Sequence, residues 1–166
     1  MKIRTFAIIV IFSLLSAVSC KKDTQLDKDK DAIIEYLNSN NIITQSVNNV
    51  YYEVLEEGDG DQCKAGDYVA YKYRYSTVAH PDYYIDTYTD FAARVQLAKD
   101  VPSASCSLPY GCQIALTTMR EGGKSRFYIP SSLAYGSSAI GSNNEVDANL
   151  IFEIELCEIL SNGAKH

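Results

Sequence analysis

The chain is poor in the residues that metal sites and cysteine nucleophiles need. Its 166 residues hold only two histidines, His80 and His166, and no Cys-x-x-Cys pair. Neither a zinc site nor a Cys-His nucleophile therefore has support, and we expect no metal and no cofactor. Basic residues are also few, because 15 Lys and Arg stand against 21 Asp and Glu, for a net charge of −6. That balance argues against a nucleic-acid partner, whose phosphates require a basic surface.

The sequence also lacks an apolar run long enough to span a bilayer. Lys2 and Arg4 precede an apolar stretch over residues 6–18, which is shorter than the ~20 residues of a transmembrane helix. This pattern is typical of a secretion signal. The stretch ends at Cys20 after Ala-Val-Ser, which resembles a bacterial lipoprotein cleavage site. We expect residues 1–19 to be removed and Cys20 to carry a lipid that anchors an exported protein to the bacterial cell envelope, at the outer membrane. An ordinary signal peptide with a chance cysteine is the alternative.

Composition divides the rest of the chain into a tether and one domain. Residues 20–30 are mostly Lys, Asp, Gln and Thr, so we expect a flexible tether. Residues 31–49 form a helix and its connector, with Asp31 as the predicted N-cap. Residues 50–160 form the domain, and residues 161–166 are a tail. Four further cysteines can form up to two disulfides in three pairings, or remain buried thiols. They are Cys63, Cys106, Cys112 and Cys157.

Periodicity predicts an α+β domain. Alternating apolar and polar residues indicate strands over 50–56, 68–76, 124–130 and 150–156, with a shorter one around Val95 and Leu97. We expect Glu153 and Glu155 to point to water, and Tyr73 and Tyr75 to pack on the sheet with their hydroxyls in water. A stripe from Cys112 to Met119 predicts one short helix, ended by Gly122-Gly123. The expected fold is a curved antiparallel sheet of about five strands wrapped around that helix, with an extra N-terminal helix.

One stretch carries a family resemblance. From Met119 to Gly136 the chain reads MREGGKSRFYIPSSLAYG, which resembles, without a gap, the signature M-x-x-G-x-K-x-x-x-x-I-P-x-x-L-A-Y-G of the FKBP-type peptidyl-prolyl cis-trans isomerases. The segment 150–156, LIFEIEL, is similar to the family's L-x-F-x-[VI]-E-L ending, and Asp86 stands where the family has a strand-end Asp. The resemblance covers roughly residues 50–160.

The resemblance implies an apolar pocket that receives a proline ring and catalyses rotation about X-Pro bonds. Its partners would be proline-containing segments of exported proteins. In this reading Tyr71 and Phe152 are pocket walls, Tyr135 donates its hydroxyl to the substrate carbonyl, and Asp86 orients the polar groups nearby. The same resemblance places five further residues in the pocket. They are Ile85, Leu108, Pro109, Cys112 and Ile140.

Several positions depart from the family pattern and support a second hypothesis. Cys112 stands where the family has a Trp pocket floor, and this chain contains no Trp. Ile85 replaces a Phe, and Pro109 lacks the N–H that usually holds the ligand carbonyl. Asn144 and Glu145 replace an Ile-Pro pair. The alternative to an isomerase is therefore a binding module or chaperone of the same fold, with weak or no catalysis.

Overall fold

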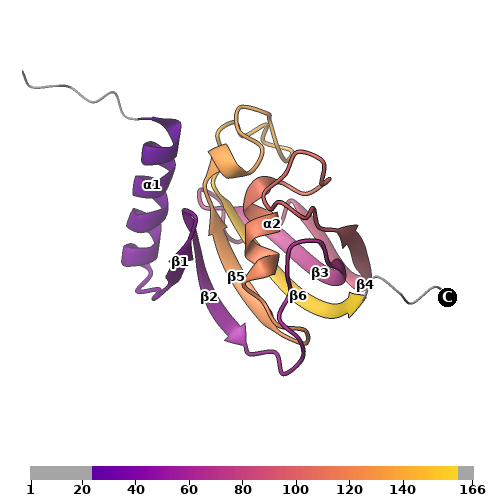
Figure 1. Cartoon of the computed structure of the whole chain (residues 1–166). Helices are drawn as coiled ribbons and strands as arrows, with labels where there is room; N and C mark the ends of the chain where they lie inside the picture. The colour runs from indigo at the N-terminus through magenta and orange to yellow at the C-terminus, as the bar shows by residue number, and fades with distance from the viewer. Residues whose placement is uncertain (1–23, 161–166) are drawn as a thin grey trace, which may run out of the picture.

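The structure is a computed structural model that describes residues 24–160, apart from the side chains of residues 87–89 and 91. Six antiparallel strands form one sheet in the order β1-β2-β5-β6-β3-β4, and Figure 1 shows α2 lying across it. The strands are β1 (Gln45–Val47), β2 (Val50–Glu56), β3 (Tyr68–Thr77), β4 (Asp86–Gln96), β5 (Lys124–Ile129) and β6 (Leu150–Leu160). The helices are α1 (Gln25–Ser39), α2 (Tyr110–Thr117) and the 3-10 turn η1 (Ser131–Leu133). The predicted fold class is confirmed, with one more strand than expected.

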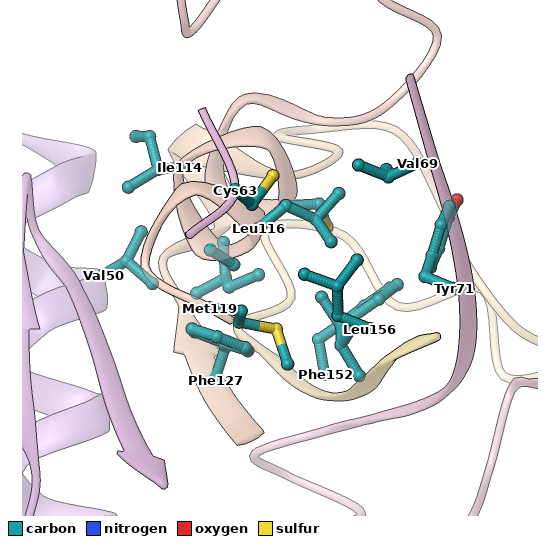
Figure 2. Close-up of a cluster of buried hydrophobic side chains, with 14 of the residues drawn as sticks. Val50, Cys63, Val69, Tyr71, Ile114, Leu116, Met119, Phe127, Phe152 and Leu156 are labelled. Carbon is teal, nitrogen blue, oxygen red and sulfur yellow. The ribbon is translucent and has the colours of Figure 1, made fainter. Parts of the chain in front are cut away.

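The main core lies between α2 and one face of the sheet. Phe127 and Phe152 come from neighbouring strands and are paired in register, and both are almost completely buried. Figure 2 shows Leu116 of α2, and Met119 just after the helix, in the same cluster as these rings. Gly111 lets α2 approach this closely, because a Cβ at that position would stand 2.1 Å from Ile129 Cγ2.

A second, smaller core lies on the opposite face of the sheet. Tyr128 and Ile151 alternate with Phe127 and Phe152 along β5 and β6, so their side chains point the other way. Ile33 and Leu37 of α1 pack on them. The N-terminal helix is thus docked on the domain. In Figure 1 it stands beside β1 and β2.

The predicted tether was wrong from Gln25 onwards. Residues 25–30 form the first turns of α1, and Thr24 rather than Asp31 is the N-cap. Thr24 and Asp27 make a reciprocal capping box, which satisfies N–H groups at the helix start without any apolar residue. The predicted connector also contains β1. Asn48 and Asn49 both have positive φ, so they form the two-residue turn that joins β1 to β2.

Other boundaries and one orientation also differ from expectation. Helix α2 ends at Thr117, before Gly122-Gly123, and the Thr117 and Thr118 hydroxyls bond back to the carbonyls of Ile114 and Ala115. The short strand predicted around Val95 is the end of a longer strand, β4, which begins at Asp86. Glu153 was expected in water but is buried on the α1 side of the sheet.

The four cysteines within residues 24–160 form no disulfide with one another. Free thiols are present at Cys63, Cys106, Cys112 and Cys157. In the same part of the chain, no helix has the length and apolar character needed to cross a membrane. The predicted signal peptide, the predicted lipidation site at Cys20 and the tail at 161–166 lie outside the described residues.

Candidate active site

Stacked aromatic rings form the centre of the candidate site. Phe152 lies 5.4 Å from Tyr73 and 5.5 Å from Tyr75 between ring centroids, with interplanar angles of 15° and 10°. Antiparallel pairing of β3 with β6 sets this contact, because Tyr75 is directly opposite Phe152 and Tyr73 is opposite Ile154. The Tyr135 ring extends the group, 6.3 Å from Tyr75. Phe152 and Tyr135, both predicted from the sequence, are thus brought together by Tyr75.

A hydrogen bond ties this aromatic group to Asp86. The Tyr73 hydroxyl donates to Asp86 Oδ2 at 2.8 Å, where Asp86 begins β4. Sequence reasoning predicted Asp86 but missed Tyr73, which it assigned to ordinary sheet packing. Tyr71, the predicted wall, is instead buried in the core and stacks on Tyr73 at 5.8 Å. All three tyrosines of β3 occupy alternate positions and so share one face of the strand. Their pairing with β6 is what distinguishes Tyr71, Tyr73 and Tyr75.

Two more predicted residues lie on the loop side of the site. The Ile85 N–H donates to the carbonyl of Tyr75 at 2.8 Å, which places Ile85 beside the aromatic group. Ile85 also packs over Gly141, because a Cβ there would stand 3.3 Å from Ile85 Cγ1. Ile140 precedes that glycine, packs against the main core and exchanges two backbone hydrogen bonds with Glu145. The polar loop after Tyr135 is thereby closed onto the site.

A cleft of about 360 Å³ opens next to Tyr135. Leu108 and Pro109 line one wall, and η1 with the residues after it lines the other. Gln113 holds the first wall in place with a fully buried side chain. Its Nε2 donates to Leu108 O at 2.7 Å and to Ser103 O, and its Oε1 accepts from Ser103 N. Sequence reasoning missed Gln113, and its only signal was a polar residue beside the apolar stripe of α2. Pro109 is the N-cap of α2, so this wall has no N–H at that position.

Cys112 lies in the first turn of α2, three residues after Pro109, and has no exposed surface. Burial and the neighbouring Cys106 raise the pKa of its thiol far above its ordinary value. Burial and the two thiols of Cys112 and Cys106 likewise raise the pKa of Tyr71. Tyr71 and Cys112 both belong to the main core, and Cys106 packs against it. Cys112, which stands at the position of the family's Trp in the sequence, is thus a packed part of the core.

Tyr135 has the properties of a neutral hydrogen-bond donor. Its side chain is 37% exposed at the cleft. Partial burial, helped by neighbouring Tyr75 and Cys112, raises the pKa of its hydroxyl well above the ordinary value. The hydroxyl therefore keeps its proton at neutral pH. A cleft with a neutral donor at its edge can hold an amide carbonyl. Among residues 24–160, no group of three or more His, Cys, Asp or Glu side chains is placed to hold a metal ion.

Known proteins resemble this chain in both sequence and fold. The family model described as FKBP-type peptidyl-prolyl cis-trans isomerase matches residues 60–157. FK506-binding protein 4 of Dictyostelium discoideum is 28% identical over 125 residues, 75% of this chain and 32% of that protein. A probable FKBP-type peptidyl-prolyl cis-trans isomerase, FkpA, of Neisseria meningitidis is 23% identical over 140 residues, 84% of this chain and 48% of that protein. The chain thus spans a third to a half of these relatives.

Solved structures share the fold. The crystal structure of a peptidyl-prolyl cis-trans isomerase from Pseudomonas syringae superposes with a TM-score of 0.62 at 23% identity, covering 82% of this chain and 97% of that one. FkpA from Escherichia coli superposes with a TM-score of 0.60 at 21% identity, covering 81% of this chain and 62% of that one. The sequence signature, the matched family model and the fold agree, and the chain belongs to the FKBP-type peptidyl-prolyl cis-trans isomerase family.

Proposed function

We propose that this chain is a lipid-anchored peptidyl-prolyl cis-trans isomerase that assists the folding of exported proteins. The observation that carries the catalytic part is the aromatic group of Tyr73, Phe152 and Tyr75, tied to Asp86 and placed beside the Tyr135 hydroxyl. The lipoprotein-like segment ending at Cys20 supports the anchoring and the export. The substrates would be proline-containing segments of unfolded or partly folded chains.

Catalysis at such a site requires only that rotation about one X-Pro bond be made easier. Rotation about an X-Pro bond faces a barrier of ~18–20 kcal/mol because the C–N bond has partial double-bond character. No covalent bond and no proton transfer is needed. The planar amide is more dipolar than the twisted one, so apolar, water-poor walls favour the twisted state. In this scheme the rings hold the proline and Tyr135 donates to the carbonyl. Asp86 fixes the orientation of Tyr73.

Removing a single hydroxyl tests the catalytic proposal. We expect Tyr135→Phe to lower kcat/KM on an X-Pro peptide by roughly fivefold, since one hydrogen bond contributes about 1 kcal/mol and about 1.4 kcal/mol corresponds to a factor of ten. Asp86→Ala should cost at least as much because Tyr73 loses its acceptor. A protease-coupled assay on the full chain measures both.

Tyr84→Phe is the matched control for Tyr135→Phe. Its ring is exposed and lies under the Arg74 guanidinium, 4.8 Å away, on the α1 side of the sheet. It should leave kcat/KM unchanged. If Tyr135→Phe and Asp86→Ala both retain wild-type rates, or the wild type does not exceed the uncatalysed rate, the isomerase proposal is wrong.

A second candidate is a binding module of the same fold. Two observations favour it: Pro109 offers no N–H at the cleft, and Cys112, which stands where the family has a Trp, is completely buried in the core. Such a module would bind a proline-containing peptide, and Tyr135→Phe would weaken binding, while the chain would not accelerate isomerisation. A titration of the same peptide alongside the rate assay distinguishes the two functions.

Attachment to the membrane is tested separately from catalysis. If Cys20 carries the lipid, Cys20→Ser should move the protein from the membrane fraction to the soluble envelope fraction. The measurement is fractionation of expressing cells, with Cys157→Ser as the control for loss of a thiol. An equal membrane-bound share in the wild type and in Cys20→Ser would contradict the anchor.

A further inference from the structure

A buried carboxylate joins the N-terminal helix to the wall of the cleft. Asp29 of α1 is only 2% exposed. Its Oδ2 accepts hydrogen bonds from Ser131 Oγ at 2.8 Å and from Ser132 N at 3.0 Å. Its Oδ1 accepts from Gln25 Nε2 at 2.8 Å. Among residues 24–160, no ion pair of 4.0 Å or shorter reaches this carboxylate. The donors that stabilise its charge are neutral groups. Because hydrogen bonds depend on distance and direction, they fix where the carboxylate lies.

The two serines that Asp29 contacts begin η1. The N-cap of this turn is Pro130, which makes no side-chain cap hydrogen bond. The first N–H groups of a helical turn lack partners within the turn, and a carboxylate is a good acceptor for them. Asp29 therefore acts as the cap of η1 from 102 residues away in the sequence.

The capped turn leads directly to Tyr135. The Ser131 carbonyl accepts from Ala134 N at 2.9 Å and from Gly136 N at 2.8 Å, which are the residues on either side of Tyr135. Residues 132–135 also form one wall of the 360 Å³ cleft. Displacement of Ser131 would thus move both the Tyr135 hydroxyl and this wall.

A second contact connects the same helix to β6. Asn149 Nδ2 donates to the Asp29 carbonyl at 3.2 Å, and Asn149 Oδ1 accepts from Ser131 N at 2.9 Å. Asn149 directly precedes β6, which carries Phe152. The main chain and side chain of Asp29 together therefore hold the segments that lead to Tyr135 and to Phe152.

The family model begins at residue 60, so α1 lies outside the part of the chain that identifies the family. We propose that Asp29 is a positioning residue: through Ser131 and Ser132 it holds η1, and with it Tyr135, in place for the isomerase reaction. Its effect on the rate rests on the proposed function. The contact itself can be tested without a substrate.

The experiment compares two replacements of Asp29 with one control. Asp29→Ala removes both acceptors, whereas Asp29→Asn keeps one oxygen that can accept from Ser132 N. Asp31→Ala is the control, because Asp31 is an exposed carboxylate two residues along the same helix. We expect Asp29→Ala to lower kcat/KM roughly tenfold, since a small misplacement of a catalytic group from a distant site can cost up to ~100-fold. Asp29→Asn should recover most of this loss, and Asp31→Ala should show none.

Amide hydrogen exchange separates positioning from general destabilisation. In Asp29→Ala we expect exchange at Ser132, Ala134 and Gly136 to rise at least roughly tenfold, while amides of β5 keep wild-type protection. Equal protection of η1 in the wild type and the variant overturns the proposal. So does a rate loss that only matches the unfolded fraction measured by circular dichroism. A wild type without isomerase activity overturns the proposed function alone, because the exchange measurement still reports on the contact.

Discussion

Replacement of Glu153 by Gln is expected to lower the free energy of unfolding by about 3 kcal/mol at pH 7. Glu153 lies on β6 with a side chain that is 6% exposed. Burial alone would raise the pKa of this carboxyl, but hydrogen bonds from Arg74, Lys124 and Arg126 lower it from 4.5 to about 2. A shift of that size corresponds to about 3 kcal/mol of preference for the ionised form in the folded protein.

The geometry around Glu153 explains the size of this effect. Its Oε1 lies 2.9 Å from Arg74 Nη2 and 3.1 Å from Lys124 Nζ, and its Oε2 lies 3.0 Å from Arg126 Nη2. These cations come from the two strands that flank β6. The Glu153→Gln substitution would leave three positive charges close together around a neutral amide, and removing one partner of a buried ion pair typically costs several kcal/mol.

The same carboxylate predicts how stability depends on pH. Because the folded-state pKa lies below the unfolded value of 4.5, the contribution of Glu153 is fully present above pH 4.5. It is lost as the pH falls from 4.5 to about 2. The difference in unfolding free energy between wild type and Glu153→Gln should therefore shrink across that range and stay constant from about pH 5 to 8.

Urea denaturation at several pH values measures this difference. Glu155→Gln is the matched control, since Glu155 is on the same strand and exposed, and it should cost less than about 1 kcal/mol. A Glu153→Gln variant that is as stable as Glu155→Gln at pH 7 would show that the cations are satisfied by solvent. An undiminished difference at about pH 2.5 would contradict the lowered pKa.

Local patterns in the sequence were sufficient for most of the fold. The strand predicted at residues 50–56 is β2 residue for residue, and the stripe from Cys112 to Met119 is buried as expected. Both depend on patterns within a few residues, and such local patterns record the type of element and which of its faces meets the core. Two local family motifs, residues 119–136 and 150–156, singled out Tyr135 and Phe152 in the same local way.

The predictions that failed depend on partners far away in the chain. The burial of Asp29 depends on Ser131 and Ser132, two of its three hydrogen-bond donors, which lie more than 100 residues away in the sequence. Glu153 alternates like a surface residue, and only the arrival of cations from two other strands makes its burial favourable. The choice between Tyr71 and Tyr73 likewise depends on the register of β3 against β6. Long-range pairing is the information that a single sequence does not show.

A Cys112→Trp substitution is expected to destabilise the protein by about 2–3 kcal/mol and to leave isomerase activity no higher. The family resemblance suggests the opposite, because Trp is the usual pocket floor. In this chain, however, Cys112 is fully buried, and the Tyr71 residue near the same thiol is only 5% exposed. Adding a large ring to a packed core forces strained rotamers and backbone shifts, which typically cost about 1–3 kcal/mol.

If Tyr71 fills the space of the missing indole, the two positions should be coupled. We expect Tyr71→Val alone to cost about 2–4 kcal/mol through the cavity that it leaves. The double variant Tyr71→Val with Cys112→Trp should be more stable than the sum of the two single losses predicts, by at least about 1 kcal/mol, because core volume is restored. It should also raise kcat/KM above that of Tyr71→Val.

A double-mutant cycle of unfolding free energies measures this coupling, with rate assays on the same four proteins. Cys63→Trp paired with Tyr71→Val is the control cycle, since Cys63 is also buried in the main core but lies outside α2. Additive energies in both cycles would show that Tyr71 does not occupy the place of the Trp. A stable and more active Cys112→Trp single variant would show that the floor is open after all, and that loss of the indole is what limits catalysis in this chain.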